Sequence, residues 1–311
     1  MDENGHVLVV GACCIDIKGI SIRELALGAD FPGQVRQNFG GVARNVAENL
    51  ARLEINAVLL SAVGGDTAGE NIIQHGQSAG INMQHVKRCL DARTGTFLSL
   101  LNPDGDEVMA VNDFDIMKEV DADYLDANHE LFESARMLIL DLNISGAALI
   151  TLLDMADHYR LPVVADPTSP FRAAALCEHL DRLYMVVPNA AETTSLCGLK
   201  VPASDHDSAI AAASHLISMG SKIAIVTLGA QGLAYADSSS KGHIPAVKAE
   251  PVDTSGAGDA LTAGVVFGLI HDMPLDEAMR LGVTAASLTL QSETSVSPTL
   301  SPDTLYNSLV V

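Results

Sequence analysis

Residues 253–259 read Asp-Thr-Ser-Gly-Ala-Gly-Asp, and an apolar run of small residues follows them as far as Ile270. This run predicts a buried helix. The Gly-Ala-Gly turn would then lie at the helix N-terminus, where free backbone N–H groups and the positive end of the helix dipole attract an anion. Because glycine has no Cβ, the backbone of such a turn can come close to a phosphate. The stretch therefore predicts a phosphate site.

Asp259 falls just inside this predicted anion site. A carboxylate beside a phosphate is electrostatically unfavourable unless it has a task, and accepting a proton from an attacking hydroxyl is such a task. This interpretation indicates phosphoryl transfer. The alternative is an ordinary helix start with an aspartate in its first turn, and the stretch alone leaves both open.

The composition bounds the fold and the partners. A chain of 311 residues fits one large α/β domain, alone or with a small accessory piece. Hydrophobic residues make up 48% of it and Trp is absent, which predicts a core of Ala, Val, Leu and Ile. The formal charge of −21 predicts a surface that repels nucleic acids and anionic lipids. An anionic substrate would need local compensation by backbone dipoles or a metal ion.

The remaining bulk features predict a cytoplasmic protein. The start, residues 1–6, is acidic and polar, unlike a signal peptide. The apolar runs are shorter than the roughly 18 residues of a transmembrane helix. The sequence contains no CxxC pattern and no His/Cys cluster, so we expect no structural metal site. We expect reduced, mostly buried thiols at all five cysteines, which are Cys13, Cys14, Cys89, Cys177 and Cys197.

Apolar strands alternate with helices along much of the chain, which predicts a parallel sheet covered on both faces. Strands are expected at 6–11, 57–64, 137–141, 162–166, 183–187 and 223–227. Residues 96–101 and 107–112 flank a strong turn signal and predict a hairpin in a small separate sheet, plausibly a lid. Residues 17–39 look irregular or extended, with a short, partly exposed strand that includes Val35 and Phe39.

Polar residues follow several of these strands. They are Asp16, Asp141 with Asn143, Asp166, Asn189 and Thr227. In an open α/β sheet, ligands bind outside the carboxyl ends of the strands. A single polar residue there would be explained by its part in a turn, but several together predict a ligand site at this edge of the sheet. Asn112 and Asp113 end the hairpin and could contact a polar ligand under the lid, or form a simple turn.

Three further segments suit ligand contacts. Gly40 and Gly41 open a helix and permit close approach, and Asn45 offers both a donor and an acceptor to a sugar diol. Asn189 and Glu192 share one face of a helix start. A carboxylate near a polyphosphate is best explained by Mg²⁺, bound directly or through water, although a helix cap is the alternative. Residues 227–232 could bring backbone to phosphate or turn a hairpin.

These motifs together resemble the ribokinase-like (PfkB) carbohydrate and nucleoside kinases, in order and over nearly the whole length. Residues 40–45 are similar to the first signature of that family, and residues 253–259 to its highly specific second one. Residues 189–192 are similar to its NxxE magnesium motif, and 227–232 to its TxGxxG nucleotide segment. A narrower likeness within the family rests on 99–101, 111–113, 141–145 and 166–167.

The resemblance implies a three-layer α/β/α fold with a mostly parallel central sheet. It also implies one kinase domain over 1–311 with a small β-sheet lid from about 16–39 and 95–113. The chain would phosphorylate a small sugar or nucleoside with ATP, Mg²⁺ and an optional K⁺, as a homodimer formed through the lid.

The implied catalytic residues are Asp259 as the base, with Gly256, Ala257 and Gly258 as the anion hole. The acceptor would contact Asp16, Gly40, Gly41, Asn45, Asn112, Asp113 and Asn143. The nucleotide would contact Asn189, Thr227, Gly229, Gly232 and Ser287; Glu192 would position Mg²⁺, and Asp253 and Ser255 a monovalent cation.

Three other functions remain as alternatives. The chain could phosphorylate a different acceptor, in the manner of ribokinase or adenosine kinase. It could be a ligand sensor that kept the fold and lost catalysis, against which the intact Asp259 and Gly-Ala-Gly turn argue. A nicotinamide-dependent dehydrogenase is disfavoured, because the first strand is not followed by a GxGxxG fingerprint.

Overall fold

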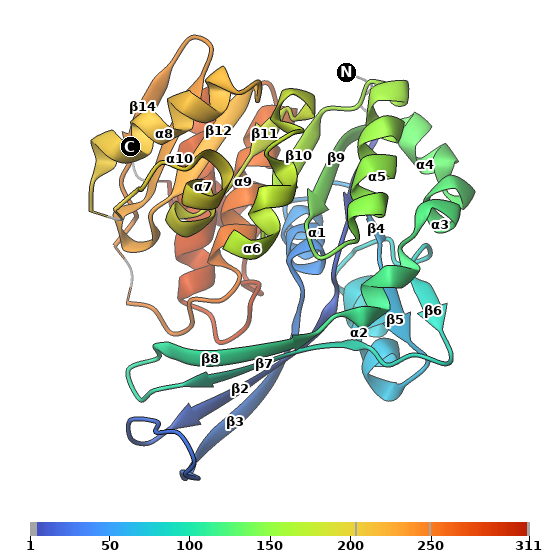
Figure 1. Ribbon diagram of the computed structural model, residues 1–311, viewed down its shortest axis with the longest axis vertical. Coiled ribbons are helices and arrows are strands. Elements are labelled where there is room, and N and C mark those ends of the chain that lie inside the picture. Colours follow the sequence, from blue (N-terminus) through green and yellow to red (C-terminus); the bar gives the residue numbers. More distant parts are fainter. Residues whose placement is uncertain (1–4, 203, 249, 310–311) are drawn as a thin grey trace.

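The computed structural model describes residues 5–202, 204–248 and 250–309. Residues 1–4, part of the acidic start that argued against a signal peptide, lie outside the described residues. A large sheet forms the middle layer between two layers of helices, and a smaller sheet extends beneath them (Figure 1). Among the described residues, no helix is both long and apolar enough to cross a membrane.

The large sheet has eight strands in the order β14-β13-β12-β11-β10-β9-β1-β4. Its strands from β4 to β12 are parallel, whereas β12, β13 and β14 pair antiparallel. The bounds are β1 His6–Val10, β4 Ala57–Leu60, β9 Ala135–Asp141, β10 Val163–Asp166, β11 Met185–Val186, β12 Ile223–Thr227, β13 Leu233–Asp237 and β14 Lys241–Ile244. The mostly parallel sheet that the sequence predicted is therefore confirmed.

Helices cover both faces of this sheet, since alternate residues of each central strand point to opposite cores. In β1, Leu8 joins one buried cluster and Val9 the other. The first face carries α3 Ala122–Ala127, α4 His129–Ser134, α5 Gly146–Tyr159, α6 Pro170–Ala173, α7 Ala190–Cys197 and α8 His206–Ser218. The second carries α1 Val42–Arg52, α2 Thr67–Ser78, α9 Ala257–Ile270 and α10 Leu275–Leu290, with α11 Pro302–Asn307 outside α9 and α10.

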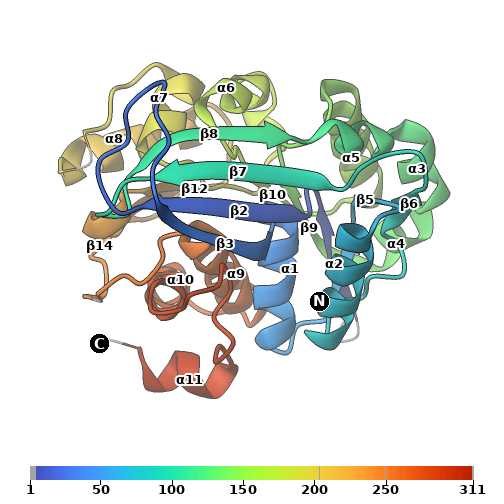
Figure 2. The same ribbon diagram turned by 90° about the horizontal axis from the view of Figure 1, so that it is seen from below.

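The smaller sheet has the order β3-β2-β7-β8, and its four strands lie side by side in Figure 2. The bounds are β2 Cys14–Ser21, β3 Gly33–Gly40, β7 Gly95–Leu101 and β8 Glu107–Asp113. The predicted hairpin is present as β7 and β8. Because β1 runs on into β2 within a few residues, the small sheet lies at the carboxyl ends of the parallel strands.

Two strand predictions were wrong in part. Residues 17–39 are extended and not irregular, because β2 and β3 pair along their whole length, and β2 also pairs with β7. The predicted strand at 57–64 breaks at Ser61, after which β5 (Ala62–Gly64) pairs with β6 (Lys87–Cys89) in a separate two-stranded sheet. In both cases long-range pairing overrode the local pattern.

The cysteines also differ from expectation in part. All five are free, but only Cys13 and Cys14 are buried. Cys89, Cys177 and Cys197 are partly exposed, so the expectation of mostly buried thiols was wrong for these three. They lie near the ends of short elements or between them, where packing covers a side chain incompletely.

Candidate active site

Only glycine fits at residue 256, the N-cap of α9. Gly256 has a left-handed backbone with φ of 75° and caps the helix. A Cβ on Gly256 would lie 1.8 Å from the carbonyl oxygen of Ser295. A Cβ on Gly258, in contrast, would meet no described atom within 4 Å. The turn is therefore closed on the side of Ser295 and open on the side of Gly258, where the first N–H groups of the helix lack intrahelical acceptors.

Close packing fixes the position of α9. A Cβ on Gly268 would lie 2.8 Å from the Cα of Ala278 in α10, and one on Gly264 would lie 2.8 Å from the carbonyl oxygen of Leu281. These glycines let the two helix backbones approach each other directly. The predicted buried helix is confirmed, and its small residues serve this approach.

Asp259 occupies the first turn of α9 and is 7% exposed. Burial and, to a smaller extent, the charge of Asp141 raise the pKa of its carboxyl, a hydrogen bond from Asn45 opposes the rise, and the net pKa is about 7. Asn45 Nδ2 donates to Asp259 Oδ2 at 2.6 Å. A carboxyl group with this pKa can exchange a proton near neutral pH, as a general base must.

Arg44 orients Asn45. Its guanidinium is 2% exposed and donates to Asn45 Oδ1, to the carbonyl oxygen of Phe39 at 2.9 Å and to Glu48 Oε2 at 2.5 Å. With Oδ1 engaged in this way, the amide nitrogen of Asn45 is directed to Asp259. The sequence analysis assigned Asn45 to a sugar diol and overlooked Arg44, although the Arg44–Glu48 spacing of four residues was a usable signal for a helix ion pair.

Asp141, at the end of β9, joins three chain segments. Its Oδ2 accepts the N–H groups of Ala12 and Ala43, each at 2.9 Å, and its Oδ1 accepts that of Asn143 at 2.8 Å. These bonds lower the pKa of this buried carboxyl, while burial raises it more. Asp141 therefore fixes the start of α1, and with it Asn45, relative to the sheet.

Asp16 lies on β2 against the Gly40-Gly41 turn. A Cβ on Gly40 would fall 2.1 Å from Asp16 Oδ1, and one on Gly41 would fall 2.3 Å from the carbonyl oxygen of Ala12. Burial raises the pKa of Asp16, and its charge contributes to the raised pKa of Asp259. The structure therefore brings Asp16, Asn45 and both glycines to the same place as Asp259.

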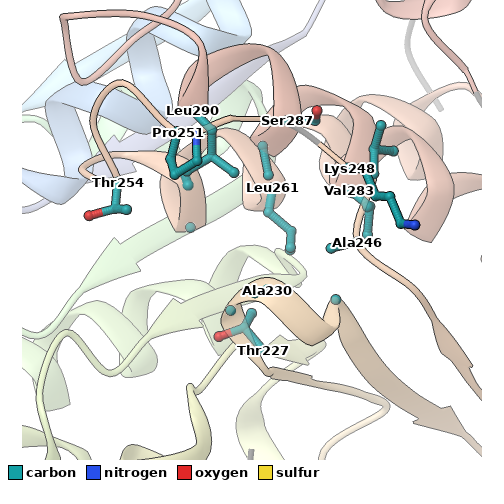
Figure 3. Close-up of a pocket in the computed structure, with 16 residues that line it drawn as sticks. Thr227, Ala230, Ala246, Lys248, Pro251, Thr254, Leu261, Val283, Ser287 and Leu290 are labelled. Atoms are coloured by element: carbon teal, nitrogen blue, oxygen red, sulfur yellow. The ribbon is translucent and has the colours of Figure 1, made fainter. Parts of the chain in front are cut away.

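A cavity of about 510 Å³ opens beside Gly258. In Figure 3, Thr227 and Ala230 line one side of this cavity, and Leu261, Ser287 and Leu290 line the other. Gly229, Gly232, Ala257 and Gly258 also line it. Four of the five predicted nucleotide residues, Thr227, Gly229, Gly232 and Ser287, thus share one cavity with two of the three predicted anion-hole residues. Residues 227–232 also turn the β12–β13 hairpin, which confirms the hairpin interpretation of this segment, whereas its contact with phosphate stays a prediction.

Asn189 and Glu192 form a capping box at the start of α7. Asn189 Oδ1 accepts the N–H of Glu192 at 2.9 Å, and Glu192 Oε2 accepts the N–H of Asn189 at 2.8 Å. Asn189 forms a backbone bridge with Thr227, which lines the 510 Å³ cavity. The cap that the sequence allowed as an alternative is present, and of the two carboxylate oxygens of Glu192 it uses Oε2.

Asp166, at the end of β10, is an acidic neighbour of Glu192. It was predicted at the strand ends but was assigned no role in the site. Burial, followed by the charges of Asp259 and Glu192, holds the pKa of Asp166 well above its ordinary value. Burial likewise raises the pKa of Glu192. Among the residues that the structure describes, no group of three or more His, Cys, Asp and Glu is arranged to hold a metal ion. These two carboxylates suit Mg²⁺, which typically takes one or two carboxylates and completes its shell with phosphate oxygens and water.

A second cavity, of about 460 Å³, lies where the end of β8 faces the start of α5. It brings together Asn112, Asp113 and Asn143, three of the seven residues expected to contact the acceptor. Arg172 also lines it and donates to the carbonyl oxygen of Leu142 at 3.0 Å. The sequence analysis did not single out Arg172, because nothing local to residue 172 connects it with β8.

Asp253 and Ser255 lie immediately before Gly256 and hold a side-chain cation. The Nζ of Lys18, on β2, donates to both carboxylate oxygens of Asp253 and to Ser255 Oγ. The sequence analysis overlooked Lys18, although its spacing from Asp16 places both side chains on one face of a strand. The monovalent cation implied for these residues therefore competes with an ammonium group.

The chain belongs to the pfkB family of carbohydrate kinases, because the sequence profile of that family matches residues 4–302. Its members are phosphotransferases with alcohol acceptors, and ATP binding is expected of them. The ribokinase-like α/β fold that the resemblance implied is confirmed.

The chain is similar to members of the family with different names. The chain is 32% identical to pseudouridine kinase of Escherichia coli over 305 residues, which cover 97% of this chain and 95% of that one. It is 26% identical to guanosine-inosine kinase of Exiguobacterium acetylicum, with 92% and 94% of the two chains covered. The fold matches a ribokinase of Arabidopsis thaliana with a TM-score of 0.84 at 21% identity, over 99% of each chain.

Proposed function

We propose that this kinase transfers the γ-phosphoryl group of ATP to the 5′-hydroxyl of pseudouridine. A bond forms between the nucleoside O5′ and the γ-phosphorus, and the bond from that phosphorus to the β,γ-bridging oxygen breaks. The hydroxyl proton passes to Asp259, and the products are pseudouridine 5′-phosphate and ADP. No covalent intermediate with the protein is involved.

The position of Asp259 carries the proposal. Its carboxyl lies in the first turn of α9, next to Gly258, which lines the larger cavity, and it touches Asn45 of α1. A donor phosphate in that cavity and an acceptor hydroxyl near Asn45 would meet at this carboxyl. Its pKa of about 7 suits removal of a proton at neutral pH. General-base catalysis of this kind contributes about 10²–10⁴-fold.

The larger cavity suits ATP. Its walls are largely apolar where Leu261, Val283 and Leu290 line it, as an adenine ring requires, and Gly258 brings the start of α9 to its edge. The N–H groups there would stabilise the charge on the transferred phosphoryl group. Glu192 and Asp166 would hold Mg²⁺, directly or through water, and the bound ion would neutralise phosphate oxygens.

The smaller cavity suits the base of the nucleoside. Asn112, Asn143 and Arg172 offer amide and guanidinium groups that can hydrogen-bond to a uracil ring. Asp16, Gly41 and Asn45 would contact the ribose. Residues 99–101, 111–113, 141–145 and 166–167 resemble pseudouridine kinase, and the Escherichia coli relative supports the same acceptor.

The small sheet would act as the lid and as a dimer interface. Its strands, drawn from 14–40 and 95–113, carry Asp16 and Asn112 to the acceptor side. Apolar side chains are exposed on it, among them Val35, Leu98, Leu100, Val108, Met109 and Val111. Pairing with a second copy through this sheet would bury them, which supports the proposed homodimer.

A coupled ADP-release assay tests the acceptor. Pseudouridine and uridine have the same base and sugar and differ only in the atom of the base that joins the ribose, so they form a matched pair. We expect turnover with pseudouridine and a much lower kcat/KM with uridine. Preference for guanosine, inosine, adenosine, ribose or fructose would favour another sugar or nucleoside kinase instead. No turnover with any of them would contradict the proposed reaction.

A further inference from the structure

Lys18 reaches from β2 to the loop that precedes α9. Its Nζ donates to Asp253 Oδ1 at 2.7 Å, to Asp253 Oδ2 at 2.5 Å and to Ser255 Oγ at 2.5 Å. Lys18 is 6% exposed, and the Asp253 side chain is 14% exposed. An ammonium group has three N–H donors, so this loop supplies an acceptor for each of them in a place with little solvent screening.

A monovalent metal ion does not fit beside this ammonium group. The family resemblance implies such an ion at Asp253 and Ser255, yet the oxygens of both side chains already accept from Lys18. A second cation at the same oxygens would lie in contact with the ammonium charge, and the repulsion is strong where water is excluded. The site therefore holds one positive charge, and the chain itself supplies it.

We propose that the ammonium group of Lys18 replaces a monovalent metal ion at the anion hole, so that this kinase works without K⁺. The inference rests on the proposed function, in which the start of α9 binds the transferred phosphoryl group. Lys18 is a positioning residue in this account, since it acts through the Asp253–Ser255 loop.

The local geometry explains what the charge does. The N–H of Ser255 donates to Asp253 Oδ1 at 2.8 Å, which closes the turn just before the left-handed Gly256. Without a cation, the carboxylate of Asp253 would be a partly buried, uncompensated charge next to a phosphate site. The Lys18 ammonium neutralises it and holds the turn that aims the N–H groups of α9.

Lys18 also connects the small sheet to the loop before α9. It lies on β2 two residues after Asp16, on the same strand that carries this acceptor-side carboxyl. The ion pair with Asp253 ties the small sheet to the anion hole. A freely exchanging metal ion could neutralise Asp253, but it could not make this covalently anchored connection.

The wild-type protein provides the first test. Its turnover by ADP release and its thermal unfolding midpoint are measured in KCl, NaCl, ammonium chloride and tetramethylammonium chloride at equal ionic strength. We expect neither quantity to change among the four salts. An ion that binds the native state raises the unfolding midpoint, so a rise in KCl together with a requirement of K⁺ for turnover would overturn the proposal.

Variants of Lys18 provide the second test. Lys18→Ala leaves room for an ion, whereas Lys18→Met keeps the apolar stem without the charge. In tetramethylammonium chloride, we expect turnover to fall roughly tenfold or more in both, because Asp253 loses its partner. KCl or ammonium chloride should restore turnover and raise the unfolding midpoint of Lys18→Ala, and should do so less in Lys18→Met.

Lys222→Ala is the matched control, since Lys222 is exposed just before β12, at the opposite end of the sheet. The turnover and the unfolding midpoint of Lys222→Ala should be the same in all four salts. Unchanged turnover and stability of Lys18→Ala in tetramethylammonium chloride would overturn the proposal, and so would a loss that no cation restores. The unfolding midpoints test the cation site even if the proposed phosphoryl transfer fails, so the two failures can be told apart.

Discussion

Asn45 and Asp259 lie 214 residues apart in the chain, and a hydrogen bond of 2.6 Å from Asn45 Nδ2 to Asp259 Oδ2 joins them. The bond links the first turn of α1 to the first turn of α9. Both helices begin with glycine caps at which the backbone comes close to its surroundings. The proposed acceptor side and the proposed phosphate side of the site therefore meet at one side-chain pair.

Asp259→Asn should keep the fold and ATP binding and lose turnover. The amide has nearly the shape of the carboxylate and can still accept the bond from Asn45, but it cannot take a proton. We expect kcat to fall about 10²–10⁴-fold, while calorimetry gives an unchanged Kd for ATP. Asp303→Asn, at an exposed aspartate on α11, is the control. A kcat within a few-fold of wild type would refute the assignment of Asp259 as the base.

The activity should depend on pH through Asp259. Its pKa of about 7 predicts that kcat/KM for the nucleoside increases from acid pH and levels off above about 7, as the carboxylate form becomes the major one. Steady-state rates between pH 5.5 and 9 measure this. Asn45→Ala removes the hydrogen bond that lowers the pKa, so the midpoint should move to higher pH. A midpoint that stays in place would show that another group titrates.

The same carboxyl should weaken the ligand-free fold as pH rises. Its folded-state pKa of about 7 lies above the ordinary 3.8, so the native state binds more protons than the unfolded state between these values. The contribution of this carboxyl to the free energy of unfolding is therefore fully present below about pH 4 and is lost as the pH rises to about 7. At 1.4 kcal/mol per pH unit, the loss is at most about 4 kcal/mol.

Asp259→Asn should remove this dependence. The variant should unfold at a higher temperature than wild type at pH 8 and at a similar temperature near pH 4. Thermal unfolding of both proteins without ligand, over that pH range, provides the measurement. A variant that is less stable than wild type at pH 8 would contradict the raised pKa.

Gly256 and Gly258 should respond differently to the same substitution. Gly256→Ala places a Cβ 1.8 Å from the carbonyl oxygen of Ser295 and requires alanine at φ of 75°. The left-handed backbone alone costs about 1–2 kcal/mol, so we expect a lower free energy of unfolding together with lost turnover. In Gly258→Ala the new methyl group enters open space beside the nucleotide cavity. We expect normal stability and a raised KM for ATP. Equal destabilisation of both variants, by urea unfolding, would contradict this geometry.

The sequence was informative wherever a local motif carries its own geometry. The Gly-Ala-Gly turn before an apolar run predicted α9, its N-terminal site and Asp259 within it, and the structure confirms the helix and the position of that carboxyl. The alternation of strands and helices predicted the parallel sheet, and the turn at 102–106 predicted the β7–β8 hairpin. These features depend on backbone conformation and hydrophobic spacing within a few residues.

The sequence was less informative where a residue depends on distant partners. Strand β2 was missed because its pairing with β3 and β7 is long-range and its own pattern does not alternate strictly. Asp141 was expected to be one of several polar residues at strand ends. Nothing near it in sequence shows that its carboxylate accepts the N–H groups of Ala12 and Ala43.

The sequence by itself determined the class of fold, the glycine turn at the start of α9 and the place of Asp259 in the first turn of that helix, because each is set by neighbouring residues through backbone sterics and hydrophobic periodicity. The tertiary structure alone decided that Lys18 neutralises Asp253 and that Arg44 directs Asn45 towards Asp259. Lys18 and Asp253 are 235 residues apart. Their ion pair exists only because the small sheet and the start of α9 come together at the carboxyl end of the large sheet, where burial removes the water that would otherwise screen them.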